Sequence, residues 1–330
     1  MNAGRLPVAF RREGKARRAP IASGGKVKAA RILNEEATSP TMPAAGQRLA
    51  ESLVAEVSGL VSPPDVCLRV AELMQDENTT ADRLGELIRR DPNLTARLLK
   101  LVNSAHYGLR GRVDTVTRAI TMIGMRELYH LVLAVSAVKS FSSIPNSLVN
   151  MDTFWRHSIF TGLIARGLAR EARVLHPERL FISGLLHDIG SLVLYFRLHE
   201  LSCTLLTQAN GNEDILYLSE QEALGFTHAD LGALLLRQWS LPETMQEAVR
   251  LHHEPFAAEI PTVDTALLAL ANKLANGSQI GAFCENPRDS VGPSRLLIEA
   301  AQLDPDDFDS EVVIGEAGLS FTETVSILAA

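Results

Sequence analysis

From residue 49 to the end of the chain, apolar residues recur at the spacing of a helix. Leu53, Val57 and Leu60 begin the series, and residues 120–141 form another strongly apolar run with the same period. Turn-forming pairs such as Pro63-Pro64 interrupt the runs, and Thr80 and Asp91 are expected to cap the helices that follow them. No alternating polar and apolar stretch of useful length appears, so the sequence predicts an all-α protein built as a multi-helix bundle.

Breaks in this pattern divide the chain into four predicted parts. Residues 1–48 lack an apolar period and are predicted to form a disordered basic arm. Residues 49–145 form an N-terminal helical half, residues 146–276 a second helical half, and residues 277–330 a helical extension. The seam between the halves is expected at Pro145-Asn146. Helices of the second half are expected near residues 152–172, 178–197, 200–209, 213–224, 228–239, 242–253 and 262–276.

Charge is concentrated at the N-terminus. Residues 1–31 hold nine Lys or Arg and one acid, for a charge of +8, and the rest of the chain carries −15. Such an arm could bind nucleic acid or acidic lipid. An inert tail, or translation that begins at Met42, is the favoured interpretation. The acidic remainder is poorly suited to nucleic acid, because phosphate binding needs clustered cations.

Cysteine usage and hydropathy restrict the compartment. Cys67, Cys203 and Cys284 lie far apart, which argues against a disulfide framework and against a cysteine zinc site. This pattern is typical of the reducing cytoplasm. No uncharged stretch exceeds about a dozen residues, so no membrane span is expected, and no secretory signal is apparent.

One dipeptide carries the chemistry of the chain. His187-Asp188 lies inside an otherwise apolar helical run, where burying both side chains is costly unless they are paired or bind a metal. Taken alone, the pair is more often a hydrogen-bonded core histidine than a ligand. Further histidines, expected on separate helices, change the balance: His157, His228, His252 and His253. Imidazole and carboxylate ligands suit Mn, Fe, Ni or Zn.

Several segments give the chain a specific resemblance. The run from Asp91-Pro92 to Ala105, the segment around Phe154-Trp155-Arg156-His157 and the later Trp239-Ser240-Leu241-Pro242 are similar to the HD-related output domain (HDOD) family of the HD superfamily. The resemblance covers roughly residues 55–275. It implies an N-terminal helical subdomain packed on an HD-type helical subdomain. It also implies a metal site that includes His157, His187 and Asp188.

Three departures from the active HD phosphodiesterases bear on catalysis. Ser191 stands where a lysine usually follows the His-Asp-Ile-Gly segment, and a neutral hydroxyl does not offset phosphoryl charge as an ammonium does. Asn272 stands where the family's late metal-binding aspartate is expected, with Asp264 as a weaker substitute. His252-His253-Glu254 resembles the start of the motif of HD-GYP phosphodiesterases, but Pro255 and the residues after it follow, and the Gly-Tyr-Pro segment of that motif is missing.

These features predict a cytoplasmic, bacterial-type signal-transduction output module. We expect it to be regulatory and non-catalytic, and to bind a protein partner or a small ligand. The expected metal ligands are His157, His187 and Asp188. They are joined by His228, by His252 or His253, and by Asn272. Whether Mn, Fe, Ni or Zn occupies the site stays open.

Two alternatives remain. One is a metal-dependent phosphohydrolase that acts on a nucleotide or a cyclic dinucleotide. The other is a nucleic-acid binder that uses Thr80 to Ala105 as a helix-turn-helix, with Asp91-Pro92 at the turn. The second is not favoured, because the same segment fits the output-domain pattern and helix pairs of this kind are common in any bundle.

Overall fold

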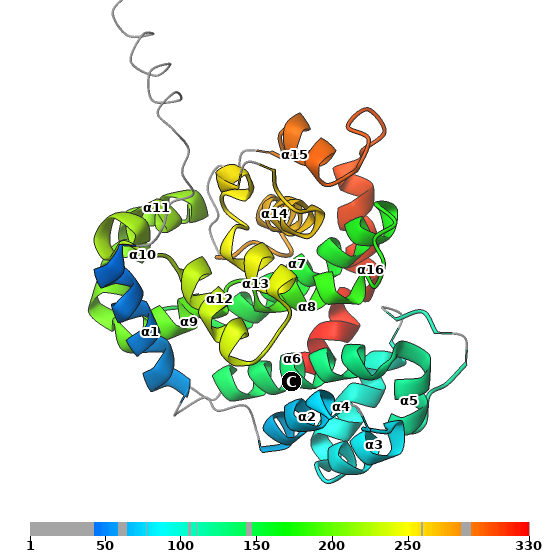
Figure 1. The fold of residues 1–330 in the computed structure, drawn as a ribbon. Coiled ribbons are helices and arrows are strands. Elements are labelled where there is room, and N and C mark those ends of the chain that lie inside the picture. The colour runs from blue at the N-terminus through cyan, green and yellow to red at the C-terminus, as the bar shows by residue number, and fades with distance from the viewer. Residues whose placement is uncertain are drawn as a thin grey trace, which may run out of the picture. The chain divides into compact units, whose positions relative to one another are not determined.

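A computed structural model describes residues 43–58, 65–76, 78–104, 107–109, 111–142, 147–258, 260–284 and 292–329. Within these ranges, helices are the only regular secondary structure, which confirms the all-α prediction (Figure 1). Residues 1–42 of the predicted basic arm lie outside the described ranges. Helix α1 (Ala44–Ser58) begins inside the last residues of that predicted arm.

The first helices after α1 form one group. They are α2 (Asp65–Gln75), α3 (Ala81–Arg89), α4 (Pro92–Val102), α5 (Val116–Ile123) and α6 (Met125–Ser142). The predicted caps are confirmed: the Thr80 side chain accepts a hydrogen bond from the backbone N–H of Arg83, and Asp91 accepts one from Leu94. Helix α1 packs against two helices from much later in the chain, α9 (Ile189–Arg197) and α12 (His228–Gln238).

The apolar run predicted over residues 120–141 is divided between two helices. Gly124 has a φ of 90°, a left-handed value that suits a glycine, and it ends α5. Helices α5 and α6 therefore meet at an angle of 118°. This bend brings the first turn of α6 toward the later helices.

The second group of helices is arranged around α7 (Met151–Glu171), which packs against α8, α14 and α16. The others are α8 (Glu178–Leu186), α9 (Ile189–Arg197), α10 (His199–Ala209), α11 (Glu213–Leu224), α12 (His228–Gln238), α13 (Glu243–Arg250), α14 (Val263–Asn276), α15 (Arg295–Ala300) and α16 (Ser310–Leu328), with a 3₁₀ turn at Pro255–Ala257. The segment Glu178–Arg197 is long and apolar enough to span a membrane, but most of it is buried in this fold, as is usual for core helices.

Glycines allow the helices around the dipeptide to approach closely. A Cβ atom on Gly184 of α8 would lie 2.5 Å from the Cα atom of Gly162 of α7. A Cβ atom on Gly190 of α9 would lie 2.6 Å from the backbone nitrogen of Gly232 of α12 and closer still to the carbonyl oxygen of His228. These contacts bring α7, α9 and α12 against the same short segment, residues 187–188.

Candidate metal centre

The dipeptide lies at a break between two helices, which corrects the single helix predicted over residues 178–197. His187 is the C-cap of α8, and Asp188 is the N-cap of α9. The change of direction lets the two side chains converge, with 3.3 Å between Nε2 of His187 and Oδ2 of Asp188. Both residues are buried.

Hydrogen bonds to the backbone fix the orientation of three imidazole rings. In each ring the Nδ1 atom lies 2.6–2.7 Å from a carbonyl oxygen: His157 pairs with Gly281, His187 with Gly184, and His252 with Val249. A carbonyl oxygen only accepts, so Nδ1 carries the proton in each ring and Nε2 presents its lone pair. This is the arrangement that metal-binding histidines usually adopt.

A first group of potential ligands consists of His157, His187, Asp188 and Glu213, whose ligand atoms all lie within 4.8 Å of one another. The Nε2 atoms of His157 and His187 are 3.1 Å apart. Oδ2 of Asp188 lies 3.5 Å from Nε2 of His157, and Oε1 of Glu213 lies 3.9 Å from that nitrogen.

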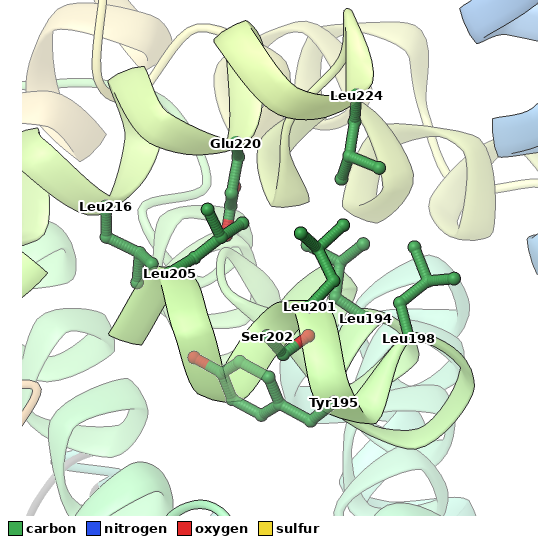
Figure 2. Close-up of a pocket in the computed structure, with 9 residues that line it drawn as sticks. All are labelled: Leu194, Tyr195, Leu198, Leu201, Ser202, Leu205, Leu216, Glu220 and Leu224. Atoms are coloured by element: carbon green, nitrogen blue, oxygen red, sulfur yellow. The ribbon is translucent and has the colours of Figure 1, made fainter. Parts of the chain in front are cut away.

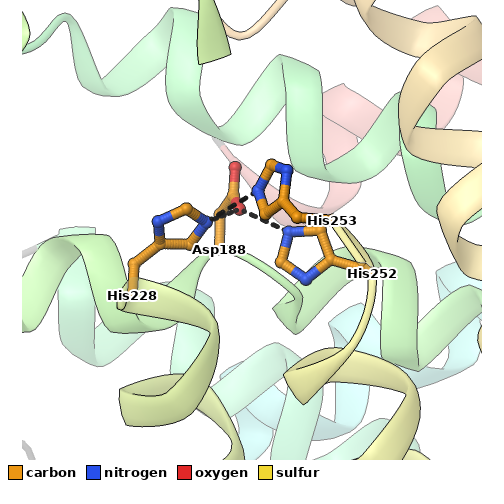
Figure 3. A group of neighbouring side chains, drawn as sticks. All are labelled: Asp188, His228, His252 and His253. Carbon is orange, nitrogen blue, oxygen red and sulfur yellow. Dashed lines mark hydrogen bonds and ion pairs between the residues drawn. The ribbon is translucent and has the colours of Figure 1, made fainter. Parts of the chain in front are cut away.

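A second group contains Asp188, His228, His252 and His253 (Figure 3). Oδ1 of Asp188 lies 3.4 Å from Nε2 of His228 and 3.5 Å from Nε2 of His252. The Nε2 atoms of His228 and His253 are 3.0 Å apart. Asp188 therefore belongs to both groups, with one carboxylate oxygen toward each.

The donor atoms fit metal ions better than they fit one another. Two imidazole lone pairs that face each other at 3.1 Å repel unless a cation or a proton lies between them. Oδ1 of Asp188 and Nε2 of His252 are buried and lie 3.5 Å apart, but neither atom forms a hydrogen bond, which is costly without a ligand. A set of imidazole and carboxylate donors suits Mn, Fe, Ni or Zn. The shared Asp188 could bridge two such ions.

Burial and neighbouring charges together shift the pKa values of His187, Glu213 and Asp188. Burial, together with the neighbouring His252 and His157, lowers the pKa of His187 to about 3. Burial and the adjacent Asp188 raise the pKa of Glu213 to about 7. The surrounding histidines overcome burial at Asp188 and hold its pKa well below the usual range.

Glu220 supports the second group from α11. Its Oε2 atom accepts hydrogen bonds from the backbone N–H of His228 at 2.8 Å and from the ring Nδ1 at 2.7 Å. Burial would lower the pKa of His228, but Glu220 and Asp188 raise it to about 9. Glu220 is almost fully buried and lines a narrow pocket whose walls are mostly leucines (Figure 2). This apolar surrounding strengthens the interaction between the carboxylate and the imidazole.

Asn272 does not point an oxygen at the histidines. Its Nδ2 atom donates to Oε2 of Glu213 at 2.9 Å, and its Oδ1 atom accepts from Asn276. Asn276 also donates to Oε2 of Glu213, at 2.5 Å. Two amides thus hold Glu213 in the place where the family pattern expects the carboxylate of an aspartate at position 272. Asp264 lies elsewhere, in a two-point ion pair with Arg179.

The structure therefore gathers six of the seven residues predicted as ligands: His157, His187, Asp188, His228, His252 and His253. Asn272, the seventh, is linked to these ligands through its hydrogen bond to Glu213. Sequence reasoning missed Glu213 and Glu220. Glu213 resembles an ordinary first-turn acid of α11, so no local signal distinguishes it.

The acids of the cluster pair with histidines and not with lysine or arginine among the described residues. Ser191, at the position of the expected lysine, is buried, and its hydroxyl interacts with Tyr195. Among the described residues, neither Asp188 nor Glu213 forms an ion pair with a lysine or an arginine. The ring of Tyr217 covers His253, with 4.7 Å between the ring centroids. Ligands for metal are thus abundant, while groups that hold a phosphate are absent from these contacts.

Comparison with known proteins agrees with this architecture. The family model described as "HDOD domain" matches residues 60–255. An uncharacterized protein of Treponema pallidum (strain Nichols) is 28% identical over 228 residues, which cover 67% of this chain and 44% of that relative. The chain thus spans less than half the length of this curated relative.

Two solved structures resemble the fold closely. A phosphohydrolase candidate from Shewanella amazonensis SB2B is 25% identical, with a TM-score of 0.63 over 84% of this chain and 97% of that one. An HDOD domain protein of unknown function from Geobacter sulfurreducens is 27% identical, with a TM-score of 0.62 over 85% and 97% of the two chains.

Proposed function

The chain belongs to the HDOD domain family, and from that premise we propose that it is a cytoplasmic signal-transduction output module whose core holds divalent transition-metal ions. In this proposal its role is regulatory and non-catalytic. It acts by binding a protein partner or a small ligand.

The observation that carries the metal half of the proposal is the convergence of imidazole lone pairs on Asp188. A backbone carbonyl holds the Nδ1 atom of each of three rings, and Glu220 holds that of a fourth, His228. The Nε2 atoms of these rings therefore face the centre of the cluster. His157, His187, Asp188 and Glu213 would hold one ion. Asp188, His228, His252 and His253 would hold the other.

The regulatory half is supported by what the cluster lacks. Phosphoryl transfer needs a group that stabilises developing negative charge, and a cation is the usual choice. Ser191 supplies none, and the described contacts of Asp188 and Glu213 include no lysine or arginine. Buried ions in such a centre would stabilise the fold that a partner recognises.

The metal content of the purified chain tests the first half. We expect about two equivalents of Mn, Fe, Ni or Zn by elemental analysis, and a loss of both in Asp188→Asn because that carboxylate is shared. The exposed Asp214 provides the matched control, Asp214→Asn, which should keep the wild-type content. Metal-free wild-type protein after growth and dialysis with each metal would refute the proposal.

The shared carboxylate also favours a second candidate, a metal-dependent phosphohydrolase acting on a nucleotide or a cyclic dinucleotide. Bound ions would supply Lewis acidity and an activated water. An assay of the Mn- or Ni-loaded chain with a generic phosphodiester separates the two functions. Turnover that disappears in His187→Ala would establish the phosphohydrolase and overturn the regulatory, non-catalytic function. If the fully metal-loaded chain shows no turnover, the regulatory function is supported.

A further inference from the structure

A second cavity lies away from the metal cluster, between the early and the late helices. Its volume is about 510 Å³, within the usual range of roughly 300–1,000 Å³ for small-molecule sites. Its walls come from the end of α2, from the bend between α5 and α6 with Glu127 and His130, and from the later half with Arg179 and Pro242.

Two buried polar atoms in this lining have no hydrogen-bond partner. They are Oε1 of Glu127 and Nδ1 of His130, which lie within one turn of α6. Glu127 is 92% buried, since its relative exposure is 8%. A buried oxygen or nitrogen without a partner is costly, and at the wall of a cavity a bound ligand is the natural partner.

The charges around the cavity select the kind of polar group that fits. Burial and the nearby Glu178 raise the pKa of Glu127 to about 7, while burial and Arg126 lower the pKa of His130 to about 4. Arg179 adds a permanent positive charge, which Asp264 neutralises from outside the cavity. Arg126 forms no ion pair among the described residues, so a ligand cation would meet its positive charge, and neutral N–H donors fit better than an ammonium group.

The remaining walls indicate the shape and charge of the ligand. Met74, Ile123 and Pro242 supply apolar surface of the kind that packs against the faces of a ring. Arg126 is exposed at the cavity and forms no ion pair within the described part of the chain. Arginine is well suited to hold a phosphate or a carboxylate at such an edge.

We infer that this cavity binds a planar nitrogen heterocycle with adjacent ring and amino N–H donors and an anionic substituent, the chemistry of a guanine nucleotide. The carboxylate of Glu127 accepts the paired N–H donors, His130 supplies a further hydrogen bond, and Arg126 pairs with the phosphate. Adenine lacks the adjacent N–H pair on its edge, so the site discriminates between the two purines.

The cavity is connected to the metal centre through the helices that form its wall. Arg179 lies on α8, which runs about 12 Å to His187. Pro242 precedes α13, which leads to His252 and His253. A ligand in the cavity would therefore contact two of the elements that carry the candidate metal ligands.

Calorimetric titration of the full chain with GMP, AMP and guanosine tests the inference, first on EDTA-treated protein so that the metal centre does not contribute. We expect GMP to bind at least about tenfold more tightly than AMP, and Glu127→Gln to weaken GMP by about tenfold or more. Arg126→Ala should remove the preference for GMP over guanosine. Arg118→Ala, an exposed arginine on α5 outside the cavity, is the matched control and should bind like the wild type.

Three results would overturn the inference: no binding of GMP at millimolar concentration, equal affinity for GMP and AMP, or unchanged GMP binding in Glu127→Gln. Loss of binding in Asp188→Asn with full binding in Glu127→Gln would place the nucleotide at the metal centre instead. The titration is repeated on the chain as purified, and thermal unfolding of the EDTA-treated protein shows that it is still folded, so the outcome does not depend on whether the metal proposal holds. Thermal unfolding of each variant confirms that it is folded.

Discussion

Asn272 donates a hydrogen bond from Nδ2 to Oε2 of Glu213 at 2.9 Å, so the residue expected to bind metal holds a carboxylate instead. In sequence terms the late metal-binding aspartate is lost. In the structure a residue 59 positions earlier in the chain, Glu213, brings a carboxyl group to the same side of the cluster. The cluster therefore has a carboxyl group where the sequence alone predicts only the amide of Asn272.

This exchange predicts the effect of removing the Glu213 charge. Glu213→Gln keeps the shape of the side chain but replaces a carboxylate ligand by a neutral amide. We expect the affinity of the first group for Zn or Mn to fall by about 10–100-fold, as for other losses around metal ligands. Elemental analysis after dialysis should show metal content falling toward one ion per chain. The exposed neighbour variant Asp214→Asn should retain the wild-type content; equal loss in both variants would speak against a role for Glu213.

The fold could be predicted largely from apolar spacing, because each helix buries one face and its caps are local. Thr80 and Asp91 cap the helices they were expected to cap. The breaks at Gly124 and at His187-Asp188 were missed. Both lie in continuous apolar runs, where the helical period is the same on either side of the break.

The site could be predicted only in part. The histidines stand out because imidazoles are uncommon in apolar helices, and six predicted residues do converge. Glu213 and Glu220 do not stand out, since acids on the polar face of a helix are ordinary. Only the packing of α11 against the cluster, a contact between distant parts of the chain, gives them their position.

Glu220 is expected to stabilise both the fold and the metal centre. Glu220→Gln removes the negative charge that accepts two hydrogen bonds from His228 in a leucine-lined pocket. Disturbing buried, charge-assisted hydrogen bonds costs about 1–3 kcal/mol. The free energy of unfolding in urea should fall by that amount, and the pKa of His228 in metal-free protein should fall from about 9. NMR titration of the imidazole measures the second effect. The exposed Glu222 on the same helix provides the control, Glu222→Gln, which should change neither quantity.

The crossing of α9 and α12 is expected to tolerate no side chain at Gly190. In Gly190→Ala the new Cβ atom would overlap the carbonyl oxygen of His228 and lie 2.6 Å from the nitrogen of Gly232. Both partners are backbone atoms, so the helices must separate, and we expect a loss of at least about 3 kcal/mol in unfolding free energy.

Gly167 provides the matched control for this substitution. It lies inside α7, and a Cβ atom there would meet nothing within 4 Å. Gly167→Ala should therefore be neutral or should stabilise the chain by roughly 0.5–1 kcal/mol, because alanine has the higher helix propensity. Thermal or urea unfolding compares the two variants. Similar losses in both would mean that the close crossing does not limit stability.

The buried carboxyl of Glu127 predicts that part of the stability of the ligand-free chain depends on pH. Its pKa rises from 4.5 to about 7 on folding, mainly through burial and through Glu178, against the opposing charges of Arg179 and Arg166. Between these two values the folded state holds a proton that the unfolded state has released. Stability from this group is therefore complete below about pH 4.5 and decreases as the pH rises to about 7, by about 3 kcal/mol in total.

Glu127→Gln has no titrating group at this position, so the difference in unfolding free energy between variant and wild type should shift in favour of the variant from pH 5 to pH 8. Urea unfolding at both pH values measures that difference, in which the other titrating groups largely cancel. A difference that stays constant with pH, or that moves in favour of the wild type, would show that Glu127 is solvated or paired in the folded protein.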